Sequence, residues 1–225
     1  MSESAEGWRR RTTRDSLGVG LAVGLYGAAF GAAATASGLS VLQTCTLSLL
    51  MFTGASQFAL VGVLGAGGAP VAAVASAMML GARNTLYGLR LASPLGLRGL
   101  RRAVAAQAVI DETTAMALAA PNTAALRLAF TVTGSSLFVG WNLSTLAGAL
   151  GSGLLGESAQ VALDAVVPAA FLALVWPRLR HSSTDRAVAA GGALVALALT
   201  PVVPPGVQVI LAAAAVGLGF GRWRR

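Results

Sequence analysis

Two neighbouring acids, Asp111 and Glu112, lie inside an apolar segment of about residues 103–119. A carboxylate at membrane depth is unfavourable by several kcal/mol unless it faces a cavity or a partner. At helical spacing Gln107, Asp111 and Thr114 would share one face, and Glu112 would point about 100° away. We therefore expect Asp111 to face a cavity, where it would either hold a substrate ammonium group or take up and release a proton. Glu112 is expected either to share this proton-coupling or ammonium-binding role or to pair with an Arg.

Arg83 stands in the apolar segment 70–91, two helical turns deeper than Arg90, whose side chain can reach the membrane interface. A guanidinium at that depth requires a carboxylate. Its partner is either one of the two acids above or the carboxylate of a bound amino acid, and the sequence leaves both open. Asn84 follows Arg83 directly and belongs to the same candidate site.

The other polar residues of the apolar segments are weaker candidates. Asp164 precedes Pro168 by four residues, so the proline would clash with the Asp164 carbonyl and loosen a helix there. Asn142 is of a type that more often bonds a neighbouring helix than a ligand. The single Cys45 and the lone His181 form no metal-ligand cluster, so we expect neither a metal nor a cofactor.

The elements that position these residues are long apolar blocks. Hydrophobic residues make up 56% of the 225 residues and charged residues 11%, and the mean hydropathy is +0.74. Helical blocks of about 17 to 25 residues are long enough to cross a bilayer. The sequence predicts an all-α, polytopic transmembrane helical bundle with about six to eight membrane segments. The blocks cover about 17–37, 41–66, 70–91, 103–119, 128–150, 158–177, 187–203 and 206–221.

All sixteen basic residues are Arg, and the net charge is +8. Apart from Arg83 and Arg127 they cluster at residues 9–14, 90–102, 178–186 and 222–225, next to apolar blocks. This placement keeps loops cytoplasmic, so a nucleic-acid partner is not expected. We expect residues 1–16 and 222–225 to be basic cytoplasmic tails, the first of them uncleaved. Between them we expect a single transport domain of residues 17–221, ending in a helix pair over 187–221.

Small residues interrupt two of the blocks. Three blocks separate the first Arg cluster from the second, and three more separate the second from the third. Either one block in each of these trios enters and leaves on the same side, or the loop that carries the second cluster faces out. Thr53-Gly54-Ala55-Ser56-Gln57 and Thr133-Gly134-Ser135-Ser136 each combine a helix-weakening Gly with hydroxyls that can cap a new helix. We expect two half-helices in each of these blocks, within two internal repeats of about 15–92 and 97–180, a feature of secondary transporters.

The chain resembles the AzlC family, the large subunits of two-component branched-chain amino acid exporters. The resemblance runs from Arg14 to about Pro177. It is carried by Phe52–Phe58, Ala82–Gly88, Asp111–Thr113, and Leu163-Asp164 with Pro168–Phe171. The family has Asn-x-Arg-His where this chain has Gly81-Ala82-Arg83-Asn84, so Arg83 carries over whereas Gly81 and Asn84 depart. The resemblance implies proton-motive-force-driven efflux of Leu, Ile or Val with a small AzlD-like membrane subunit.

The residues and the resemblance together predict a multi-pass transporter subunit of a bacterial inner membrane, with a cytoplasmic N-terminus, rather than an enzyme. Two alternatives stay open: a non-transporting scaffold or partner subunit, and a carrier of another small apolar solute. Half-helix N-termini at Ser56 and Ser136 could receive a substrate carboxylate. The predicted substrate-binding residues are Thr53, Gly54, Ser56, Gln57, Arg83, Asn84, Thr133, Gly134 and Ser136.

Overall fold

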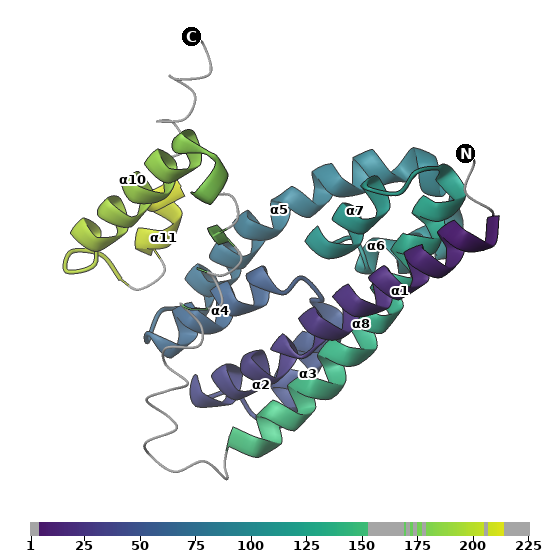
Figure 1. Cartoon of the computed structure of the whole chain (residues 1–225). Coiled ribbons are helices and arrows are strands. Elements are labelled where there is room, and N and C mark those ends of the chain that lie inside the picture. The colour runs from purple at the N-terminus through teal and green to yellow at the C-terminus, as the bar shows by residue number, and fades with distance from the viewer. Residues whose placement is uncertain are drawn as a thin grey trace.

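The computed structural model describes residues 5–152, 169, 172, 175–176, 179–204 and 207–213, and every element in this part of the chain is helical. The predicted all-α class is therefore confirmed, whereas Asp164 lies outside the described residues. Figure 1 shows the helices. They are α1 (Ala5–Gly24), α2 (Tyr26–Ala36), α3 (Val41–Leu50), α4 (Ala55–Gly65), α5 (Pro70–Leu95), α6 (Gly99–Gln107), α7 (Asp111–Leu118), α8 (Thr123–Gly151), α10 (Ser183–Leu199) and α11 (Val207–Ala212).

Helices α1 and α2 form an almost continuous rod that lies alongside α8. Glycines bring the two backbones together: a Cβ at Gly20 would overlap the hydroxyl of Ser136, and one at Gly31 would overlap the carbonyl of Thr145. Residue numbers rise together along this contact, so the rod and α8 run parallel. Small residues at such a seam allow the close approach typical of membrane helices. The contact fixes which ends of α1 and α8 lie together.

Helices α3 and α4 double back on each other, and we call residues 41–65 the first hairpin. Helix α3 begins four residues after Ser37, at the end of α2. Helix α4 ends at the same place, because a Cβ at Gly65 would lie 2.6 Å from Oγ of Ser37. The tip of the hairpin is the break at residues 51–54. The predicted helix break at Thr53-Gly54 is confirmed.

A second hairpin, α6 and α7 (residues 99–118), enters from the opposite end of the bundle. Helix α6 starts just after α5 ends, and α7 leads into the start of α8. The start of α8 lies beside the end of α5, because Nε of Arg127 donates to the carbonyl of Pro94 at 2.9 Å. Both ends of this hairpin therefore lie at the end of the bundle where α1 begins, as Figure 1 also shows.

The predicted break at Thr133-Gly134 is wrong, because α8 is one helix from Thr123 to Gly151. The hydroxyl of Ser136 donates to the carbonyl of Val132 at 2.7 Å, so it bonds backward within the helix instead of capping a new one. Gly134 serves a contact: its missing side chain leaves room for Ala108, whose Cβ would be 3.2 Å from a Cβ at Gly134. The predicted segment that turns back is therefore 103–119, and not 128–150.

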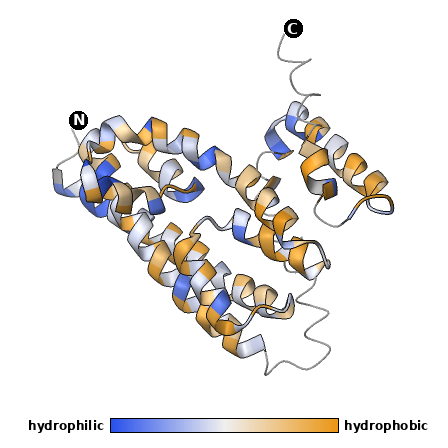
Figure 2. Cartoon of the chain, turned by 180° about the vertical axis from the view of Figure 1, so that it is seen from behind, coloured by the Kyte–Doolittle hydropathy of each residue, from blue (hydrophilic) through white to orange (hydrophobic). Residues whose placement is uncertain are grey.

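Large apolar side chains cover much of the outer surface, as is typical of a protein that lies in lipid. Leu25 is 72% exposed, Val71 81% and Leu143 64%. Figure 2 shows hydrophilic residues around the start of α1 and hydrophobic ones along most of the helices. The rod Glu6–Ala36 and helix α8 are both long and apolar enough to cross a membrane. The bundle is an α-helical membrane protein.

Candidate functional site

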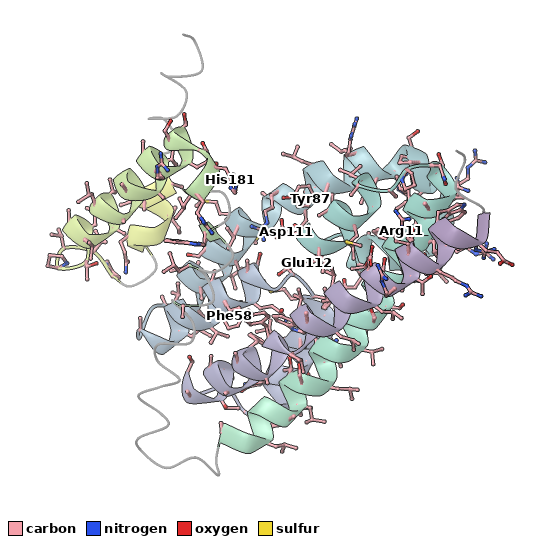
Figure 3. The ribbon with its side chains drawn as sticks, viewed as in Figure 1. Arg11, Phe58, Tyr87, Asp111, Glu112 and His181 are labelled. Atoms are coloured by element: carbon pink, nitrogen blue, oxygen red, sulfur yellow. The ribbon has the colours of Figure 1, made fainter. Side chains whose placement is uncertain are left out.

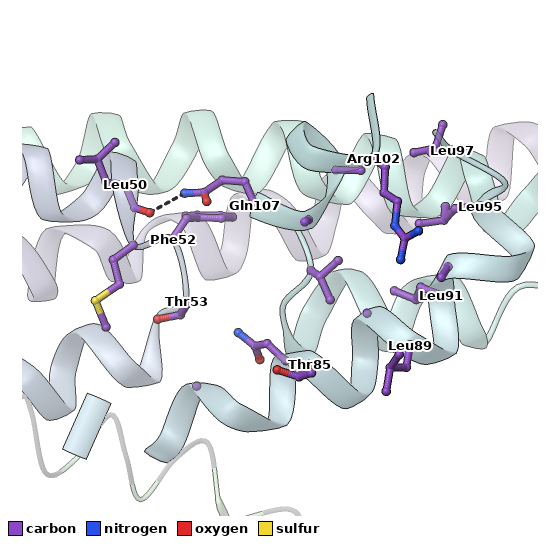
Figure 4. Close-up of a pocket in the computed structure, with 18 residues that line it drawn as sticks. Leu50, Phe52, Thr53, Thr85, Leu89, Leu91, Leu95, Leu97, Arg102 and Gln107 are labelled. Atoms are coloured by element: carbon purple, nitrogen blue, oxygen red, sulfur yellow. Dashed lines mark hydrogen bonds between the residues drawn. The ribbon is translucent and has the colours of Figure 1, made fainter. Parts of the chain in front are cut away.

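The tips of the two hairpins meet inside the bundle. Nε2 of Gln107, the last residue of α6, donates to the carbonyls of Leu49 and Leu50 at 2.9 and 3.0 Å, which satisfies the exposed carbonyl end of α3. Figure 4 shows the contact to Leu50 as a dashed line. Phe52 and Ile110, one from each tip, belong to the same buried apolar cluster. The two breaks are therefore held against each other.

Each tip is braced by the third residue of the helix that follows it. In the first hairpin, Oε1 of Gln57 accepts from the Gly54 N–H at 3.1 Å and Nε2 donates to the Leu47 carbonyl at 3.3 Å. In the second, Oγ1 of Thr113 accepts from the Ile110 N–H at 3.1 Å. Gln57 is fully buried. Its amide, predicted to bind substrate, is engaged by the backbone of its own tip.

Arg83, Tyr87 and Asp111 form a polar cluster between α5 and α7. An amino group of Arg83 lies 2.5 Å from Oδ2 of Asp111, and the Tyr87 hydroxyl donates to Oδ1 at 2.8 Å. Figure 3 shows Tyr87 and Asp111 approaching each other from the two helices, with Glu112 beside them. Of the two partners expected for Arg83, the structure shows the protein acid. Nε of Arg83 is buried and has no hydrogen-bond partner.

The polar face predicted for Gln107, Asp111 and Thr114 does not exist, because the helix is interrupted between the first two. Helix α6 ends at Gln107, and α7 begins at Asp111. Gln107 therefore turns to α3, whereas Asp111 turns to α5. Asp111 and Glu112 occupy the first turn of α7, where acids stabilise the positive end of a helix. This turn is a helix start that periodicity alone did not reveal.

A cavity of about 550 Å³ lies between the first tip, α5 and α6 (Figure 4). Thr53 and Asn84 line it, and Oγ1 of Thr53 and Oδ1 of Asn84 are buried without partners. Ser56, only 1% exposed and also unpartnered, faces the lining residue Gly81. The remaining lining residues are Leu50, Met51, Phe52, Thr85, Gly88, Leu89, Leu91, Ala92, Leu95, Leu97, Arg102, Ala105, Ala106, Gln107 and Val109.

The predicted site residues thus separate into groups. Thr53, Ser56 and Asn84 lie at or beside the cavity. Asp111, expected to face a cavity, instead pairs with Arg83, and neither residue lines it. The three predicted residues of α8, Thr133, Gly134 and Ser136, do not line the cavity, and Asn142 donates within its own helix to the Phe138 carbonyl at 2.8 Å.

Sequence reasoning missed three residues of the site: Tyr87, Gln107 as a brace, and Thr113. Tyr87 is one helical turn from Arg83, and that spacing was the available signal.

Comparison with known proteins assigns the chain to a family. A family model described as AzlC protein matches residues 18–155. Inner membrane protein YgaZ of Escherichia coli (strain K12) is 30% identical over 175 residues, which is 72% of this chain and 69% of that protein. No solved structure matches. The matched region contains both hairpins, the cavity and the ion pair. The chain therefore belongs to the AzlC family of membrane proteins.

Proposed function

We propose that this protein is the large subunit of a secondary transporter that exports branched-chain amino acids across a bacterial inner membrane. The observation that carries the proposal is the meeting of two hairpin tips beside a cavity with unpartnered buried polar groups, and an ion pair that joins the second tip to α5. Broken helices whose ends face a site near mid-membrane are the means by which many secondary transporters hold a solute. Family membership and the similarity to an inner membrane protein support a transport role.

The two tips differ in charge in a way that suits a zwitterion. The first turn of α4 carries Ser56 and no acid, so its free N–H groups and positive dipole end favour a carboxylate. The first turn of α7 carries Asp111 and Glu112, which favour an ammonium group. Leu, Met and Phe side chains of the cavity suit an aliphatic side chain. The internal pair Arg83–Asp111 already joins the two charges that a bound amino acid would bring.

Exchange of partners at Asp111 provides a route to coupling. In the structure its carboxylate is held by Arg83 and Tyr87. A substrate ammonium, or a proton, would neutralise the acid and release the guanidinium to meet the substrate carboxylate. We propose that proton uptake at Asp111 drives this exchange and links export to the proton gradient. Glu112, next to it in the same turn, is the second acid of the site.

We also propose a cytoplasmic N-terminus and a small AzlD-like membrane partner. The Arg clusters at residues 9–14 and 90–102 lie at the same end of the bundle, because the first hairpin turns back and only the rod and α5 cross between them. Arg-rich ends lie on the cytoplasmic side. The exposed apolar surface of the helices offers ample area for lipid and for a partner subunit.

Efflux of labelled leucine tests the proposal. Cells lacking endogenous leucine export, or proteoliposomes containing the protein with its small partner, are loaded with labelled leucine, and the initial efflux rate is measured with and without a proton gradient. Asp111→Asn is expected to lower the rate about tenfold to a hundredfold, the loss of one charge-assisted hydrogen bond. Asp15→Asn is the matched control, since Asp15 pairs with Arg14 in the exposed N-terminal helix. That variant should export normally.

Two outcomes would contradict the proposal. Wild-type protein that moves no aliphatic amino acid would favour a non-transporting scaffold subunit. Asp111→Asn that exports normally would remove the acid from the mechanism. Because Asp111→Asn also leaves Arg83 without its partner, the double variant Arg83→Gln/Asp111→Asn is compared by thermal unfolding. A double variant that folds normally and still fails to export separates the loss of transport from a loss of stability.

A further inference from the structure

We propose that Gly88 sets the largest amino acid side chain that the transporter accepts. This inference rests on the proposed function and adds the residue that determines selectivity at the site. Gly88 lies in α5 and lines the cavity. Its position along the helix, the empty space beside it and the polarity of the cavity around it each support the assignment.

Gly88 occupies the middle of the face that α5 turns to the cavity. Gly81, Asn84, Ala92 and Leu95 also line the cavity, at seven and four residues before and after it. Residues at these spacings share one helix face. A side chain at position 88 would therefore project into the cavity between its two ends.

The space beside Gly88 is open. A Cβ built there would meet no atom within 4 Å, whereas a Cβ at Gly24 would lie 3.1 Å from Gly140. Glycine in a helix interior is less stable than alanine by about 1 kcal/mol. In membrane helices that loss is usually offset by close contact with a neighbour, as at Gly24. Gly88 has no such contact, so the feature that its missing side chain maintains is the free volume of the cavity.

The cavity carries polar groups on both sides of Gly88. One turn before it, about 6 Å along the helix, lies Asn84 with its unpartnered carbonyl oxygen, and Thr53 lines the same cavity. On the other side lie Leu91 and Leu95, with the Arg102 side chain beside them (Figure 4). A solute that extends through the cavity between Asn84 and Arg102 would pass along Gly88. A side chain added at position 88 would compete with that solute for the same space.

The test replaces Gly88 by Ala, Val and Leu in the full-length protein with its small partner. Initial efflux rates of leucine, valine and alanine are measured for each variant. Efflux of leucine should fall progressively, by roughly tenfold to two-hundredfold when the two side chains overlap. Efflux of alanine should change least, so the ratio of alanine to leucine efflux should rise. Gly18→Leu is the matched control, because Gly18 lies on the exposed surface of α1 with no atom within 4 Å. Its selectivity should match that of the wild type.

Thermal unfolding of the same variants separates selectivity from misfolding. Gly88→Ala is expected to be at least as stable as the wild type, because alanine favours the helix and meets no neighbour. Free leucine added to the protein should raise the Tm of the wild type and should not raise the Tm of Gly88→Leu. An unchanged ratio of alanine to leucine efflux in Gly88→Leu overturns the inference, and so does a wild type that leucine does not stabilise. A third outcome separates the two proposals. If added leucine stabilises the wild type but not Gly88→Leu, and the wild type exports no amino acid, the export proposal is contradicted and the inference about Gly88 is upheld.

Discussion

Replacing Gln57 by Leu tests whether this side chain braces the first hairpin or binds the solute. The wild-type amide accepts from the Gly54 N–H and donates to the Leu47 carbonyl, and the side chain is fully buried. Leucine has a similar size and neither hydrogen-bonding group. If Gln57 is a brace, the substitution lowers stability in the absence of any solute.

The expected loss of stability depends on which hydrogen bonds the two backbone groups keep in the variant. The Leu47 carbonyl still accepts from the Met51 N–H at 2.9 Å, so its lost bond is worth about 1 kcal/mol. The Gly54 N–H loses the partner that Gln57 gives it, and an unsatisfied donor away from water costs about 1 to 3 kcal/mol. The apolar leucine side chain offsets part of this by favourable burial. The free energy of unfolding should fall by about 2 kcal/mol.

Thermal unfolding of the detergent-solubilised protein provides the measurement. For a chain of this size the loss corresponds to a decrease in Tm of roughly 4 to 8 °C. Gln43→Leu is the control, because Gln43 makes the same kind of contact at the start of α3, accepting from the Ser40 N–H at 2.8 Å, but is exposed. Its Tm should change by about 2 °C or less. A Gln57→Leu protein with wild-type Tm that is no longer stabilised by leucine would refute the brace and make Gln57 a ligand.

Two further substitutions test the backbone contacts of the bundle. Gly148→Ala should lower the stability by about 1 to 3 kcal/mol, because its Cβ would overlap the Ala28 carbonyl across the parallel seam, whereas Gly151→Ala, with open space around it, should leave Tm within about 2 °C of the wild type. Gly54→Ala should lower the stability by about 1 to 3 kcal/mol through backbone strain, since Gly54 has φ of +58°. A steric clash would not contribute, because the nearest atom to an added Cβ is 3.9 Å away. Wild-type Tm values in Gly148→Ala or Gly54→Ala would contradict the seam or the strained tip, respectively.

The first hairpin could be predicted from the sequence because its signals are local. Thr53-Gly54-Ala55-Ser56 combines a residue that permits a positive φ with hydroxyls suited to a helix start, and the structure places the break there. The same reasoning failed at Thr133-Gly134-Ser135-Ser136. Serine and threonine hydroxyls can also bond back to the preceding turn, and a glycine can serve a neighbouring helix instead of a break. Only tertiary contacts distinguish the two cases.

The second hairpin was missed because its break contains no glycine or proline. Residues Ala108, Val109 and Ile110 are apolar and fit a helical pattern, so a continuous helix was expected. The remaining signal was the pair Asp111-Glu112 followed by Thr113, which is a favourable composition for a first helical turn. The acids were interpreted as a buried polar face because their sequence position lies at mid-segment. The structure explains their position in another way: α7 begins in the middle of this segment, and the two acids form its first turn.

The two tips are braced alike and differ in their charge, and this difference bears directly on the proposed substrate. Gln57 and Thr113 occupy the third position of their helices and each accepts from the backbone N–H that precedes the helix. With this register, Ala55 corresponds to Asp111 and Ser56 to Glu112. The uncharged α4 start can accept an anion, and the acidic α7 start can accept a cation. Because the two tips meet within the bundle, the two helix starts belong to one site in the proposed mechanism, and a zwitterion is the small solute that would match both at once.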